Sequence, residues 1–127
     1  MLMETNATGT FDEVLDRMSS AVEGSGFGIL AIHDFKKTME SKGIPFPARC
    51  TVFEVCNPPF AARILGRNIA FSTVLPCRIS VYEQGEEVHI GLVSPSATIR
   101  QLTDDTELHG VAGEVENRLR QIVAAAV

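Results

Sequence analysis

Residues 49–66, RCTVFEVCNPPFAARILG, contain a complete transition from strand to helix. The stretch 49–56 is rich in Val, Phe and Thr, which favour β-strands. Asn57 can cap a helix with its side chain, and Pro58 suits the first helical position because no N–H is needed there. Gly66 is typical of the residue that follows a helix. The stretch therefore predicts a strand that runs directly into a short helix.

The chain before this stretch predicts two further helices around one strand. Thr10 and Glu13 form a capping box, and apolar residues follow at helical spacing up to position 22. The continuous apolar run at 26–33 predicts a buried strand. Asp34 can cap a short helix over 35–42.

The chain after it predicts an extended segment at 70–75, a hairpin with strands at 78–82 and 87–93, a loop at 94–96 and a last helix that opens at 104–107. The element order is α-β-α-β-α-β-β-α. This mixture predicts an α+β fold with a mainly antiparallel, four-stranded sheet and helices packed on one face. We expect residues 1–127 to form a single domain.

Composition and net charge limit the partners that we expect for this chain. The chain has 127 residues, 45% of them hydrophobic, and a net charge of −5. A nucleic-acid partner is not expected, because such binding usually requires a basic face. No segment reaches the roughly 18 to 20 apolar residues that span a bilayer, and no secretory signal is visible, so we expect a cytoplasmic protein without a membrane partner.

Two of the three cysteines, Cys56 and Cys77, bracket the predicted helix. They suggest metal or haem ligands, a redox couple, or two small buried residues. Neither belongs to a Cys-x-x-Cys pair, so the pattern is weak for structural zinc. Cys56 directly precedes a capped helix, whose N-terminus lowers a thiol pKa, which makes it the best candidate for a reactive thiolate.

Strand alternation predicts a polar surface on one face of the sheet. Side chains point to opposite faces in turn, so Glu54, Cys56, Tyr82 and His89 are expected to share the face away from the helices, with Cys77 at its edge. This surface combines thiol, imidazole and carboxylate groups. It predicts a site for a small ligand or a metal, or a dimer interface.

The most patterned half of the chain carries a family resemblance. The matching motifs are Gly26-Phe27 after the opening helix, Asp34 after the first strand, Lys37-Thr38, Cys56-Asn57-Pro58, Leu75-Pro76-Cys77 and Val81-Tyr82-Glu83. In order and spacing this stretch resembles the domain of unknown function 302 family of small bacterial and archaeal α+β proteins. The resemblance implies an α+β domain, a homodimer and no established activity, and it assigns no role to Arg78.

We therefore expect a non-enzymatic, homodimeric binding module for a small ligand, metal or haem. The predicted ligand-binding residues are Glu54, Cys56, Cys77, Tyr82 and His89. The cofactor, if there is one, is not identified by the sequence. A thiol-dependent redox protein or enzyme centred on Cys56 is one alternative, and an interaction subunit without a ligand is another.

Overall fold

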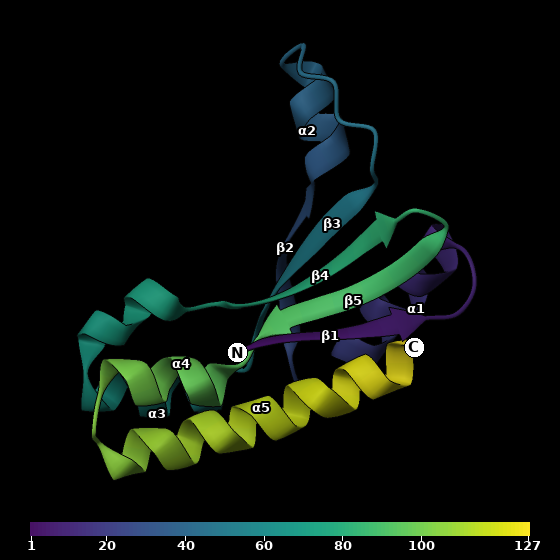
Figure 1. Cartoon of the computed structure of the whole chain (residues 1–127). Helices are drawn as coiled ribbons and strands as arrows, with labels where there is room; N and C mark the ends of the chain where they lie inside the picture. The colour runs from purple at the N-terminus through teal and green to yellow at the C-terminus, as the bar shows by residue number, and fades with distance from the viewer.

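The computed structural model describes residues 1–127 as an antiparallel sheet with most of its helices on one face (Figure 1). The five strands lie in the order β1-β5-β4-β3-β2. The strands are β1 (Leu2–Ala7), β2 (Gly28–Asp34), β3 (Cys50–Cys56), β4 (Cys77–Gln84) and β5 (Glu87–Val93). The helices are α1 (Phe11–Glu23), α2 (Phe35–Ser41), α3 (Pro58–Arg67), the 3-10 helix η1 (Ile69–Val74), α4 (Pro95–Leu102) and α5 (Thr106–Ala126). The predicted α+β class is confirmed.

Local capping explains where two of the helices begin. Thr10 accepts a hydrogen bond from the Glu13 N–H at 3.2 Å, and the Glu13 carboxylate accepts one from the Thr10 N–H at 3.1 Å. Asn57 Oδ1 accepts a hydrogen bond from the N–H of Phe60 at 3.2 Å and starts α3. These contacts satisfy N–H groups that the first turn of a helix leaves free. They confirm the predicted starts of α1 and α3.

The prediction of four strands is wrong, because β1 adds a fifth. It pairs with β5 from Leu2 opposite Val93 to Ala7 opposite Val88. Its sequence, LMETNA, has few of the β-branched or aromatic residues that favour strands. The segment is extended because the edge of β5 offers it a row of hydrogen-bonding partners.

Two other local predictions also differ from the structure. Residues 70–75, expected to be extended, lie largely in η1. The expected loop at 94–96 begins α4 instead: Ser94 accepts a hydrogen bond from the N–H of Ala97 at 3.1 Å, and Pro95 occupies the first turn. This is the same cap-and-proline start that the sequence shows at α3.

The predicted buried strand at 26–33 is an edge strand. β2 pairs only with β3, and its register shifts between Ile29 and Ala31. Leu30 and Ile32 are 61% and 54% exposed. An unbroken apolar run is typical of a strand covered on both faces, but here the sheet ends at β2 and leaves these side chains in solvent.

Alternation along the other strands is as predicted. The buried hydrophobic side chains of β3, β4 and β5 all lie on the face that packs against the helices: Phe53, Val55, Ile79, Val81, Val88, Ile90 and Leu92. They meet the apolar side of α5, from Leu108 to Ala126, and the buried residues of α1. The opposite face is called the open face below, because no helix covers it (Figure 1).

α5 and α2 differ in how much of the core they contact. α5 is long and runs beneath the sheet, and α1, α3 and α4 all pack against it. α2 packs mainly against β2 and β3 and projects beyond the ends of these strands (Figure 1). None of the helices combines the length and apolar composition that crossing a bilayer requires.

Replacing Ile79 by Ala should lower the free energy of unfolding by about 2 to 5 kcal/mol, because the side chain is fully buried and its removal leaves a cavity. Ile69→Ala is the control, since Ile69 is 72% exposed and its loss should change stability by less than about 0.5 kcal/mol. Urea unfolding of both variants measures the difference. Equal losses would show that the helix-facing side of β4 is misassigned.

Candidate functional site

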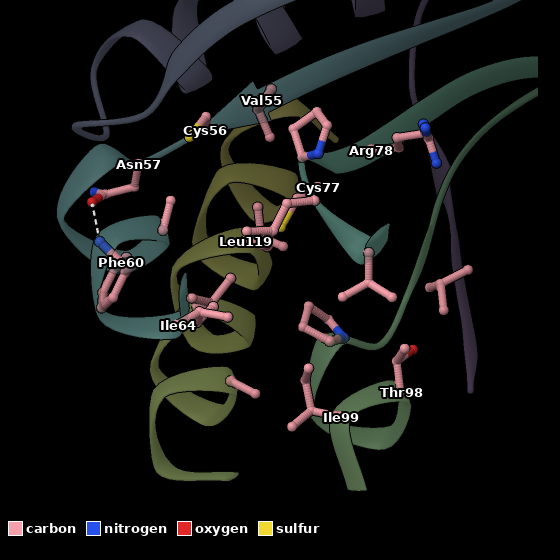
Figure 2. Close-up of a pocket in the computed structure, with 18 of the residues that line it drawn as sticks. Val55, Cys56, Asn57, Phe60, Ile64, Cys77, Arg78, Thr98, Ile99 and Leu119 are labelled. Atoms are coloured by element: carbon pink, nitrogen blue, oxygen red, sulfur yellow. Dashed lines mark hydrogen bonds between the residues drawn. The ribbon is translucent and has the colours of Figure 1, made fainter. Parts of the chain in front are cut away.

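A cavity of about 330 Å³ lies between the helix layer and the end of the sheet where β3 stops and β4 starts (Figure 2). Its walls come from α3, η1, α4 and α5 and from the adjoining ends of the strands. The chain turns sharply from β3 into α3 at Asn57, and it enters β4 through the cis peptide bond between Leu75 and Pro76. The strand ends and the helices line this half-open space together.

The lining of the cavity is mostly apolar. Of the 20 lining residues, 14 are hydrophobic. The larger ones include Phe27, Phe60, Ile64, Ile99, Val115 and Leu119. Phe60 lies against Phe27 with 6.4 Å between the ring centroids. The space is a concave, apolar site of the kind that binds small molecules.

Both bracketing cysteines line this cavity. Cys77 is opposite Val55 in the register of β3 and β4, and like Val55 it faces the helices. Figure 2 shows the Cys77 sulfur directed toward Leu119, whereas Cys56 lies beside Asn57 at the end of β3. Both thiols are free.

Burial changes the acidity of the Cys77 thiol. Loss of solvent, with a smaller contribution from the neighbouring Cys56, raises the pKa of Cys77 from 9.0 to about 11. The thiol therefore stays protonated at neutral pH. A protonated thiol is a weak nucleophile and behaves as a small apolar group.

The other three predicted ligand residues, Glu54, Tyr82 and His89, do not line the cavity. They lie on the open face, so the structure separates the expected single site into two regions. The alternation argument placed Cys77 at the edge of the open face, but its strand position puts it with the buried residues Ile79 and Val81. A ligand role for the three open-face residues stays a prediction.

Tyr82 and His89 form a stacked pair on the open face. Their ring centroids are 5.4 Å apart, with 10° between the ring planes. The Tyr82 hydroxyl donates a hydrogen bond to the Glu4 carboxylate, and partial burial together with this bond raises the pKa of Tyr82 to about 12. His89 Nε2 is 3.0 Å from a carboxylate oxygen of Glu87. This nitrogen is buried, and the contact does not have the geometry of a hydrogen bond.

Glu54, on β3, contacts side chains from both neighbouring strands, β2 and β4, on the same face. Its Oε1 atom is 3.3 Å from His33 Nε2 and 3.5 Å from Arg78 Nε. Arg78 is 66% exposed, so solvent weakens this attraction. The open face therefore carries both acidic and basic groups.

The next feature is the arrangement of side chains that could bind a metal ion. No group of three or more His, Cys, Asp or Glu side chains is arranged to hold a metal ion. The apolar cavity, by contrast, is a site with a defined volume and lining.

Sequence reasoning missed most of the cavity lining. Phe60 and Ile64 fall in the helix predicted after Asn57, and Val115 and Leu119 fall in the predicted last helix, but no sequence motif marks them as site residues, and α4 was not predicted. Helical periodicity identifies a buried side, but it does not distinguish a filled core from the wall of a cavity. The only local indication was the pair of cysteine motifs at the two ends of the segment.

The raised pKa of Cys77 predicts a stability change at high pH. Between pH 9.0 and about 11 the unfolded chain loses the thiol proton while the folded chain keeps it, so the free energy of unfolding falls with rising pH. The loss should reach at most about 3 kcal/mol. Urea unfolding of the wild type and of Cys77→Ala from pH 8 to 11 isolates this contribution, which the variant should lack. Parallel pH profiles would contradict it.

A solved structure and a curated protein are similar to this chain. The chain is 26% identical to a protein described as "uncharacterized conserved protein DUF302 from Bacillus stearothermophilus", whose crystal structure superimposes with a TM-score of 0.93 over 99% of this chain and 98% of the other. It is 27% identical over 85 residues to an uncharacterized protein of Aquifex aeolicus (strain VF5), a match that includes 66% of this chain.

The chain spans about half the length of this curated relative, 53%. The family model described as "Domain of unknown function DUF302" matches residues 3–126, nearly the whole chain. The resemblance seen in the sequence motifs is thereby confirmed, and the chain belongs to the DUF302 family.

Proposed function

We propose that this protein is a non-enzymatic binding module that holds a small, largely apolar ligand in the cavity between α3, α4 and α5. The observation that carries the proposal is the half-open cavity of about 330 Å³ with 14 hydrophobic residues in its lining. Ligand sites typically have volumes of roughly 300 to 1,000 Å³ and mostly apolar walls. An apolar ligand gains free energy there by leaving water.

The neutral polar groups of the lining support an apolar occupant. The Thr73 hydroxyl donates to the carbonyl of Ala70 at 2.9 Å, and the Thr98 hydroxyl donates to the carbonyl of Ser94 at 2.9 Å. The oxygen of the Asn57 side chain serves as the α3 cap. Because these groups are satisfied within the chain, they do not require a polar ligand.

A thiol-dependent enzyme or redox protein centred on Cys56 is the alternative, and it is supported by the presence of both thiols in one cavity. The Cys77 thiol, whose pKa burial raises to about 11, is a weak nucleophile, so this alternative would depend on Cys56. Cys56→Ser distinguishes the two. It should leave the affinity for an uncharged apolar molecule unchanged within about twofold if the cavity only binds.

Filling the cavity should abolish binding. Ala61 lines the cavity, whereas the next residue on α3, Ala62, is exposed and does not. Ala61→Phe should weaken binding of the uncharged fluorescent probe N-phenyl-1-naphthylamine by about tenfold or more, equivalent to about 1.4 kcal/mol. Ala62→Phe is the matched control and should bind like the wild type. Fluorescence titration of the three proteins measures the affinities.

The probe experiment can fail in two clear ways. If the wild type does not bind the probe, or if Ala61→Phe and Ala62→Phe bind it equally, the cavity is not the ligand site. Thermal unfolding of each variant verifies that the fold is intact.

We also propose that two copies associate through the open face of the sheet. Leu2 and Val93 are neighbours on this face and are 65% and 53% exposed. Glu54 and Glu4 lie on the same face as Arg78, so it carries charges of both signs. A twofold interface joins identical patches, which lets the carboxylates of one copy approach the basic groups of the other. This arrangement would cover the apolar groups that one chain leaves in water.

The test is the mass of the protein in solution. Light scattering after size-exclusion chromatography should give about twice the chain mass of 13.8 kDa. Val52→Lys, on the open face between Ser80 and His33, should give a monomer because it buries an unpaired charge at the interface. Leu102→Lys, at the end of α4, is the control and should remain dimeric. A monomeric wild type would mean that this face is simply solvated.

A further inference from the structure

We infer that the free edge of β1 binds an extended peptide segment of another protein, which adds to the sheet as a further antiparallel strand. The side chains of this segment alternate between apolar and polar, and the apolar ones lie in a groove between β1 and α5. The groove shares no residue with the lining of the cavity, so binding here is independent of the proposed function.

The unpaired backbone of β1 is the first observation. β1 ends the sheet and pairs only with β5 (Figure 1). The N–H of Ser94 donates to the carbonyl of Met1 at 2.7 Å, so residue 1 directs its backbone toward β5. Hydrogen bonding alternates along an antiparallel strand. The backbone N–H and C=O groups of Leu2, Glu4 and Asn6 therefore point away from the sheet.

β1 lacks the features that normally block such an edge. Proline, lysine, a bulge or a covering element commonly prevents an edge strand from pairing with another chain. The sequence of β1, LMETNA, contains neither Pro nor Lys, and its register with β5 is unbroken. Its one charged side chain, Glu4, accepts a hydrogen bond from Tyr82. The opposite edge, β2, differs because its register shifts between Ile29 and Ala31.

The second observation is a groove of about 310 Å³ at this edge, between the strands β1 and β5 and the helix α5. Six of its nine lining residues are hydrophobic: Met3, Ile90, Leu92, Val123, Ala124 and Val127. Thr5 is exposed although it lies on the helix-facing side of β1, so the helix layer does not close this edge. A strand beside β1 can therefore place every second side chain against apolar groups.

The two observations specify the same kind of partner. In β-strand addition, main-chain hydrogen bonds give affinity and pockets for alternate side chains give specificity. The free backbone groups of β1 select an extended main chain, and the groove selects apolar side chains on one face of it. Twofold pairing with the β1 of a second copy would also place two α5 helices side by side, each with Arg120 in the groove lining. A peptide brings no such like charge.

The register predicts which N–H groups of the peptide are needed. Directly opposite residues of an antiparallel pair have side chains on the same face, and alternate residues bond to the neighbouring strand. Peptide residues opposite Leu2, Glu4 and Asn6 therefore direct their N–H groups toward β1 and their side chains to the open face. The residues between them direct their side chains into the groove and their N–H groups away from β1.

The experiment uses the fluorescein-labelled peptide Lys-Val-Thr-Val-Thr-Val-Lys, whose valines match the groove. Fluorescence anisotropy with the full-length protein measures its affinity. N-methylation of both threonines removes N–H groups that face β1 and should weaken binding by about tenfold or more. N-methylation of the first two valines removes N–H groups that point away, and it should leave the affinity unchanged within about twofold.

Two pairs of variants test the site on the protein. Asn6→Pro removes an outward N–H without removing a bond to β5, and it should weaken binding by about fivefold, whereas Asn6→Ala keeps this N–H and should bind like the wild type. Ala124→Phe fills the groove and should weaken binding by about tenfold. Ala125 is exposed and does not line the groove, so Ala125→Phe is the matched control. Thermal unfolding of each variant verifies that the fold is intact.

Several results would overturn the inference. These are a wild type that does not bind the peptide, equal binding or the reverse order of the two N-methylated peptides, and equal binding by the members of either pair of variants. A lower mass of Asn6→Pro in light scattering would assign the edge to a second copy instead. Ala61→Phe fills the cavity and should bind the peptide like the wild type, so failure of the peptide leaves the proposed function standing.

Discussion

Packing of the apolar side of α5 against the sheet is the interaction on which the rest of the structure depends. Its buried residues run from Leu108 to Ala126 along nearly the full length of the helix. α1, α3 and α4 pack against it in turn, so α5 holds together the layer that covers the sheet. Its last turn is tied to the start of the chain, since the Ala126 carbonyl accepts from Arg17 Nε at 3.0 Å and the Val127 carbonyl accepts from the Thr8 N–H at 3.1 Å.

The cavity is a consequence of the same packing. α5 supplies part of its wall through Ala112, Val115 and Leu119, while α3 and α4 provide the sides. Protein interiors are normally filled, because an empty apolar space forfeits dispersion contacts. A ligand that occupies the space restores these contacts and stabilises the folded state by mass action. The partly buried thiol of Cys77, whose pKa is raised to about 11, is a weak nucleophile in this lining.

The two faces of the sheet have different surroundings. The helix face is closed by the core, whereas the open face presents a stacked Tyr82–His89 pair, exposed apolar side chains and charges of both signs. An antiparallel sheet tolerates water on one face, so the open face does not need a cover for the chain to fold. Its composition nevertheless suits contact with an identical surface. Arg78 belongs to the open face, where its side chain lies beside Glu54.

Local sequence signals determined the parts of this protein that depend on neighbouring residues. The caps at Thr10 and Asn57, the alternation along β3 and the hairpin around Gly85, whose φ is 64°, all follow from interactions within a few residues. The α+β class and the family follow from these elements and their order.

Tertiary structure alone decided the remaining features. β1 is a strand only because β5 lies beside it, and Leu30 and Ile32 are exposed only because the sheet ends at β2. Cys56 and Cys77 share a cavity that excludes Glu54, Tyr82 and His89 because helices from distant parts of the chain enclose one end of the sheet. Periodicity can mark a side chain as inward-facing. Whether the space it faces is filled or hollow depends on segments far away in the sequence, and no local pattern records their shapes.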